Sequence, residues 1–113
     1  MSRQVIAAGL LTLVAVAAHA GNPEAGKEKS RPCAACHGPD GNSAVADFPK
    51  LAGQHYDYLV KSLRDYKSGA RKNAIMAPQV ANLNPRDFED LAAFYSQQPG
   101  LVTRKSSYLA REH

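Results

Sequence analysis

Apolar side chains recur at steps of three and four residues in two segments of this 113-residue chain, which is the spacing of an amphipathic helix. The first predicted helix covers about residues 54–67 and should end near Gly69; its apolar stripe is Tyr56, Leu59, Val60, Leu63 and Tyr66. The second should begin at Asn84-Pro85 and end near Gln98; its stripe is Phe88, Leu91, Ala92 and Tyr95. Each stripe predicts a helix that buries one face.

A further helix start lies at Asn22-Pro23, with Asn at the N-cap and Pro at the first helical position. The segment that follows has Ala25 as its only apolar side chain before Pro32, so helix propensity alone would not hold it. Residues 38–43 have the composition of a turn, and residues 43–49 predict an irregular loop. No segment has the pattern of a strand. We therefore predict an all-α fold.

The first 20 residues have the pattern of a secretory leader. Arg3 precedes an apolar run of 14 residues from Val5 to Ala18, and Ala18-His19-Ala20 is a typical cleavage site. A membrane-spanning helix needs roughly 20 apolar residues, so an uncleaved anchor is the weaker alternative. We expect export to the periplasm, removal of residues 1–20, and one small domain over residues 21–113 without stable membrane insertion.

The distribution of charge gives no indication of a nucleic-acid partner. The formal net charge is +4, from 14 Lys and Arg against 10 Asp and Glu, and the basic residues are spread along the chain without a nucleic-acid motif. Loss of Arg3 with the leader would leave the domain only mildly basic. We therefore expect no nucleic-acid partner.

The most informative chemistry is the motif Cys33-Ala34-Ala35-Cys36-His37. Two thiols at positions i and i+3 lie about one helical turn apart, so they can add across the two vinyl groups of one haem. The histidine that follows can then place an imidazole nitrogen under the macrocycle. The motif C-x-x-C-H therefore predicts one covalently attached haem c, with Cys33 and Cys36 as thioethers and His37 as an iron ligand.

Other interpretations of the two cysteines are weaker. A thioredoxin-like C-x-x-C motif requires a βαβ context, which is missing here. A structural zinc site requires four ligands, and the chain has neither a second cysteine pair nor a paired-histidine motif. A disulfide between Cys33 and Cys36 would close a very small loop and add little stability.

Met76 is the candidate for the second iron ligand. The chain has two methionines, and Met1 would leave with the leader. We expect Met76 in a non-helical stretch after the helix predicted over residues 54–67, where a loop could fold over the haem face opposite His37. The alternative is a methionine that fills a gap in the core. A histidine and methionine pair raises the reduction potential and leaves no open site on the iron, which favours a carrier over a catalyst.

Four segments in this order resemble the class I cytochrome c family: residues 33–38, 48–54, 71–76 and 90–96. The resemblance covers about residues 24–98 and is strongest to small periplasmic single-haem members and to one half of the di-haem cytochromes of the c-four type. It implies three to four helices wrapped around one covalently attached haem. The tail, residues 99–113, lies outside it, and the single haem motif excludes a full di-haem protein.

The resemblance also implies roles for individual residues. Pro49 matches the proline whose carbonyl accepts the imidazole N–H of the ligand histidine, and Leu51 matches a residue that packs on the haem. Gly26 matches the small residue at the crossing of the first and last helices. Pro32 departs from the family pattern, because it stands where an apolar residue usually continues the first helix, and it should kink that turn.

These observations predict a soluble periplasmic carrier that moves single electrons between redox proteins or membrane respiratory complexes and is not an enzyme. We expect a monomer that docks transiently around the haem edge. Lysines such as Lys27, Lys29, Lys50, Lys61 and Lys72 could steer acidic partners or could simply be solvated. Two alternatives remain: a dedicated cytochrome subunit of a dehydrogenase or oxidase, and a haem enzyme or sensor with an open sixth site.

Overall fold

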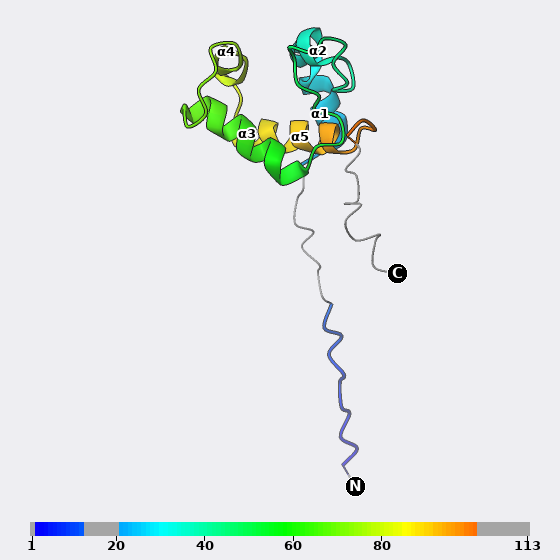
Figure 1. Ribbon diagram of the computed structural model, residues 1–113. Helices are drawn as coiled ribbons and strands as arrows, with labels where there is room; N and C mark the ends of the chain where they lie inside the picture. The colour runs from blue at the N-terminus through cyan, green and yellow to red at the C-terminus, as the bar shows by residue number, and fades with distance from the viewer. Residues whose placement is uncertain (1, 13–20, 102–113) are drawn as a thin grey trace, which may run out of the picture.

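The computed structural model describes residues 2–12 and 21–101, and within these ranges it has five helices and no strand. The helices are α1 (Pro23–Lys29), α2 (Arg31–His37), α3 (Tyr56–Ser68), α4 (Met76–Val80) and α5 (Pro85–Ser96) (Figure 1). The predicted all-α class is confirmed. The predicted cleavage site and residues 102–113 lie outside the described residues. None of the helices described is long and apolar enough to cross a membrane.

Helix α5 forms the centre of the fold, with seven buried residues. Its N-terminus has a capping box, in which the Asn84 side chain accepts from the Asp87 amide and the Asp87 carboxylate accepts from the Asn84 amide. Helix α3 lies beside α5 (Figure 1). The core between and around them consists of Leu59, Leu91, Ala92, Phe94 and Tyr95. Both helices that the apolar stripes predicted are therefore confirmed.

Helix α1 crosses α5 at Gly26, as the family resemblance implied. A Cβ atom at Gly26 would lie 1.9 Å from the Asp90 carbonyl oxygen and 2.8 Å from the Phe94 Cβ. Gly21, just before α1, is in similarly close contact, because a Cβ there would lie 2.1 Å from the Glu89 carbonyl group. The two glycines let the backbone of the N-terminal segment touch the backbone of α5.

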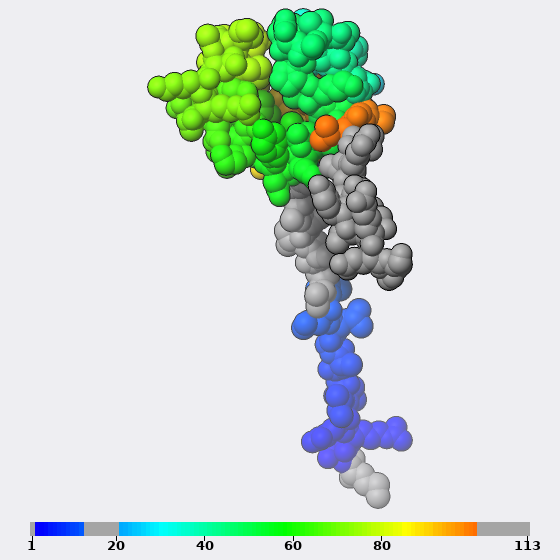
Figure 2. Space-filling model, viewed as in Figure 1, coloured from blue at the N-terminus to red at the C-terminus, as the bar shows by residue number. Residues whose placement is uncertain are grey.

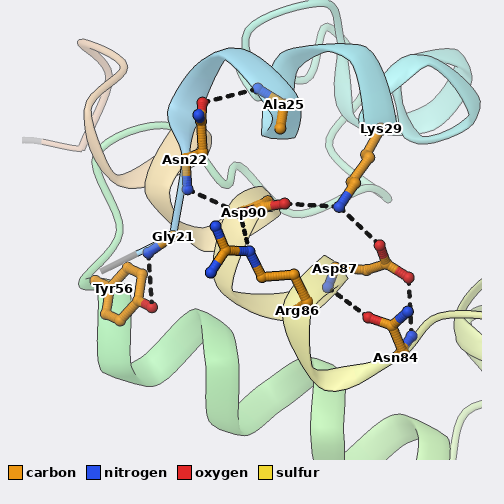
Figure 3. Close-up of polar contacts among 9 residues, drawn as sticks. All are labelled: Gly21, Asn22, Ala25, Lys29, Tyr56, Asn84, Arg86, Asp87 and Asp90. Atoms are coloured by element: carbon orange, nitrogen blue, oxygen red, sulfur yellow. Dashed lines mark hydrogen bonds and ion pairs between the residues drawn. The ribbon is translucent and has the colours of Figure 1, made fainter. Parts of the chain in front are cut away.

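An ionic network around the buried Asp90 also joins α1 to α5 (Figure 3). The Lys29 Nζ lies 2.8 Å from Asp87 Oδ1 and 2.6 Å from Asp90 Oδ2, and Asp90 Oδ1 accepts from the Asn22 amide at 2.8 Å. Arg86 completes it, with its Nε 3.3 Å from Asp90 Oδ1. Lys29 is therefore engaged in holding α1 to α5, which reduces its use for steering.

The network shifts three pKa values. Hydrogen bonds to Asp87 and Asp90 raise the pKa of Lys29. The hydrogen bond from Lys29 lowers the pKa of Asp87. Burial by itself would raise the pKa of Asp90. Two effects outweigh burial and lower this pKa: the hydrogen bonds from Lys29 and the Asn22 amide, and the positive charges of Lys29 and Arg86. All three groups stay charged at neutral pH.

The helix predicted to start at Asn22-Pro23 is divided into α1 and α2 at Ser30. Ser30 ends α1 and begins α2, and its hydroxyl donates to the Lys27 carbonyl at 2.7 Å. Pro32 lies in the first turn of α2, where its missing N–H costs no helical hydrogen bond. The predicted kink at Pro32 is thus a break at Ser30, about two turns before His37.

Met76 differs from its predicted setting. The sequence predicted a non-helical stretch, whereas Met76 is the first residue of the five-residue helix α4. Pro78 does not prevent this helix, because the amides of the first turn need no partner inside the helix. Val80 is the buried residue that fixes α4 to the rest of the fold.

The loop between α2 and α3 is held against the end of α5. The Gly53 amide donates to the Tyr95 carbonyl at 2.9 Å, and the Leu101 amide donates to the Ala52 carbonyl at 2.9 Å. The Asn42 side chain donates to the Pro99 carbonyl at 2.9 Å. Residues 38–53 contain neither helix nor strand, as predicted for residues 43–49, but these contacts give the loop a fixed position.

Candidate haem site

A cavity of about 380 Å³ lies between α2, the loop after it, α3, α4 and α5. Its lining includes every residue that the sequence singled out for a cofactor: Cys33, Cys36, His37, Pro49, Leu51 and Met76. Figure 2 shows the surface hollowed between the α4 segment and the loop that follows α2. The volume is in the range of cofactor sites, about 300–1,000 Å³.

The imidazole of His37 has a defined orientation. His37 is the buried last residue of α2, and its Nδ1 lies 2.8 Å from the Pro49 carbonyl oxygen. A carbonyl oxygen can only accept, so Nδ1 carries the proton and donates. Nε2 is then the nitrogen with a free lone pair, which is the form that binds a metal. The contact that the resemblance implied for Pro49 is present in the structure.

The two cysteines are half-buried on α2, and neither forms a disulfide. Their spacing on a helix places both on one side of α2, where both line the cavity. Burial raises the pKa of the Cys33 thiol. Cys33 and Leu51 also pack against the buried core cluster around Tyr95, so this end of the cavity is continuous with the apolar core.

Tyr95 supplies an unusual group to the same cavity. Its side chain is 3% exposed, and its hydroxyl is buried without a hydrogen-bond partner among the described residues. Burial also raises the pKa of this hydroxyl, because its anion would be desolvated. Buried hydroxyl groups are seldom left unsatisfied, so an additional polar group beside Tyr95 would complete this region.

The cavity fits a haem by the chemistry of its donors. One cavity is lined by the residues that carry two thiols, an imidazole and a thioether, and Leu59, Leu63 and Leu91 are among its remaining lining residues. No group of three or more His, Cys, Asp or Glu suited to a metal ion occurs in the described parts of the chain. Thiols, an imidazole and a thioether are the groups by which proteins hold haem c, so this set of side chains is compatible with that cofactor.

Sequence reasoning missed the residues that support Met76. Residues 71–76 carried part of the family resemblance, but no role was predicted for Arg71 or Asn73, and both line the cavity. The Asn73 side chain accepts from the amides of Ile75 and Met76. An asparagine two or three residues before a short apolar run is a signal of helix capping and could have predicted α4.

The comparisons with known proteins identify the family. The cytochrome c family matches residues 23–98. A crystal structure of reduced recombinant cytochrome c4 from Pseudomonas stutzeri superposes with a TM-score of 0.69 and 46% sequence identity, covering 74% of this chain and 48% of that one. Cytochrome c-554(548) from Halomonas halodenitrificans is 42% identical over 82 residues, which are 70% of this chain and 99% of the relative.

A third relative has a functional name. The thiosulfate dehydrogenase electron acceptor of Stutzerimonas stutzeri is 44% identical over 68 residues, which are 59% of this chain and 32% of that protein. The chain spans about half the length of the cytochrome c4 relatives that it matches, and it resembles one half of these di-haem proteins.

The chain therefore belongs to the cytochrome c family of haem-containing electron-transport proteins. Its cofactor is covalently bound haem c. The class I cytochrome c fold implied by the resemblance is confirmed, although α2 and α4 bring the helices of the described residues to five instead of three to four.

Proposed function

We propose that this protein is an exported, periplasmic single-electron carrier. In this proposal Cys33 and Cys36 hold one haem c as thioethers, and His37 Nε2 and Met76 Sδ are the axial ligands of its iron. The observation that supports it best is the convergence of two thiols, a free imidazole lone pair and a thioether on one cavity. When bound, the haem supplies one-electron exchange between ferric and ferrous iron.

The residues of the chain would tune this exchange. The Pro49 carbonyl keeps His37 in one tautomer and raises its basicity as a ligand. The Met76 thioether favours ferrous iron, so it raises the reduction potential. Water is kept out of the cavity by the apolar side chains of Leu51, Leu59 and Leu91. A dry site disfavours the extra charge of ferric iron and so also raises the reduction potential. With both axial positions filled, exogenous ligands have no vacant site.

Partners would be redox proteins or membrane respiratory complexes that dock transiently on a monomer near the cavity opening. Lys50 and Lys72 are exposed and form no ion pair within the described ranges, and Lys50 lines the cavity. Lys61 is paired with Asp65 on α3, which reduces its use for steering. Steering of an acidic partner would rest on lysines such as Lys50 and Lys72.

The periplasmic location follows from the leader pattern of residues 1–20 and from the extracytoplasmic attachment of haem c. N-terminal sequencing of the protein purified from its host should begin at Gly21. An intact residue 1 on haem-loaded protein would reject cleavage. The burial of Gly21 against Glu89 is consistent with a domain that begins there.

Carbon monoxide titration of the ferrous protein tests the axial ligands. We expect the wild type to resist carbon monoxide and Met76→Ala to bind it readily with a lowered reduction potential, because the substitution empties one axial position. Gln79→Ala is the matched control, since Gln79 lies on α4, lines the cavity and has no thioether. Ready binding by the wild type would favour a haem enzyme or sensor.

The second candidate function is a dedicated electron-acceptor subunit of a dehydrogenase or oxidase. It is favoured by the relative named as an electron acceptor of thiosulfate dehydrogenase. Purification from the native host separates the two: a stable heteromer with an enzyme would favour the subunit, and a monomeric cytochrome would favour the carrier.

A further inference from the structure

We propose that Asn73 is a positioning residue that holds Met76 in place as an iron ligand, by capping α4 with its side chain. This inference rests on the axial role proposed for Met76. The inference concerns how firmly the Met76 thioether is held at the iron. The residues that line the cavity do not by themselves determine this.

The connection from α3 to α4 is fixed first at Arg71. Gly69 ends α3 in the left-handed conformation, with φ of 84°, and turns the chain back along the helix. The Arg71 amide then donates to the Asp65 carbonyl at 3.0 Å, and the Arg71 guanidinium lies 4.7 Å from the centre of the Tyr66 ring. The segment that carries Met76 therefore leaves α3 from a defined point.

Asn73 then forms three hydrogen bonds to the start of α4. Its Oδ1 accepts from the amides of Ile75 and Met76, both at 2.9 Å, and its carbonyl accepts from the Ala77 amide at 3.0 Å. Because both side-chain partners are N–H donors, the amide oxygen must face the helix. The amide of Met76 itself is thus tied to Asn73.

Helix α4 needs this support. It has five residues, one of which is Pro78, and so short a helix does not form by its own propensity. Ile75, the residue directly before α4, makes no side-chain cap, and the buried Val80 anchors only the far end. Asn73 is exposed, so its contribution comes from the hydrogen bonds and not from packing in the core.

Loss of the cap should therefore loosen Met76 and leave the rest of the fold unchanged. A side-chain cap changes a local equilibrium by roughly fivefold, within a range of about two- to thirtyfold. An external ligand that competes with the thioether should gain the same factor in apparent affinity, because it binds the fraction of molecules in which Met76 is detached.

Imidazole binding to the ferric holoprotein measures this fraction by absorption. We expect Asn73→Ala to bind imidazole roughly fivefold more tightly than the wild type. Asn73→Ser should return to within about twofold of the wild type, since a serine hydroxyl also accepts from backbone amides. The control is Asn82→Ala, an exposed asparagine just beyond α4. Amide hydrogen exchange at Ile75 and Met76 should quicken in Asn73→Ala only.

Each other outcome overturns the proposal in a recognisable way. Unchanged imidazole affinity in Asn73→Ala, even with faster amide exchange, would show that the cap does not hold Met76. Equal effects of Asn73→Ala and Asn73→Ser would assign the effect to something other than the accepting oxygen. If the wild type already binds imidazole as well as Met76→Ala, the axial role of Met76 fails, and the inference fails with it.

Discussion

Substitution of Gly26 by alanine tests how closely α1 approaches α5. The added Cβ would lie 1.9 Å from the Asp90 carbonyl oxygen and 2.8 Å from the Phe94 Cβ. Neither partner can yield by rotating a flexible side chain, because one is backbone and the other is the first atom of a buried side chain. Helix α1 would have to move away from α5, and the Lys29 network would be stretched with it.

The magnitude follows from two opposing effects. Overpacking in a core costs about 1–3 kcal/mol, and a clash with backbone belongs at the upper end of this range. Alanine has a higher helix propensity than glycine, which by itself would raise the free energy of unfolding by about 1 kcal/mol. We therefore expect Gly26→Ala to lower the free energy of unfolding by about 2 kcal/mol, which corresponds to a fall in Tm of about 10 °C for a domain of this size.

Thermal unfolding of the holoprotein, followed by circular dichroism, measures the change. Lys27→Ala is the matched control, since Lys27 is the exposed neighbour of Gly26 on α1 and should change stability by less than about 0.5 kcal/mol. A Gly26→Ala protein as stable as the wild type, or more stable, would refute the close helix crossing.

Three other predictions address the network, the haem attachment and the docking. Asp90→Asn should lower the free energy of unfolding by about 2 kcal/mol at pH 7, because it weakens charged hydrogen bonds. The folded pKa of Asp90 is below its unfolded value, so its contribution to the free energy of unfolding is present above about pH 4 and disappears as the pH falls through the folded pKa. Urea unfolding at a series of pH values should therefore show that stability falls less steeply with acid in Asp90→Asn than in the wild type. An equal fall in both proteins would contradict this. Cys33→Ala and Cys36→Ala should each lose most covalent haem on denaturing gels, and full retention in both would remove the cysteines from this role. Electron transfer to an acidic partner should slow as salt rises, whereas a salt-independent rate would exclude steering by the lysines.

The sequence predicted the elements whose signals are local. In α5 the capping residues Asn84 and Asp87 are three positions apart, and within each of α3 and α5 the apolar residues recur every three or four positions. These local patterns alone were enough to predict both helices. The contact between His37 and Pro49 was also accessible, because the family resemblance fixed its spacing.

Apart from the Asn73 cap, the missed features depend on contacts between residues that are distant in the sequence. From the sequence, Lys29 would be expected to be solvated, because its partner Asp90 lies 61 residues away along the chain. Helix α4 is too short to show a period, and its formation depends on the Asn73 cap and on the burial of Val80. The break at Ser30 could not be predicted locally, because it depends on α1 packing against α5 while α2 places its cysteines at the cavity.

Denaturing extraction of the exported, purified protein tests the central claim most directly. If Cys33 and Cys36 are bonded to a haem in the cavity, acid and organic solvent will leave the colour on the polypeptide. A colourless polypeptide, with the pigment in the organic phase or absent from the start, would contradict the account.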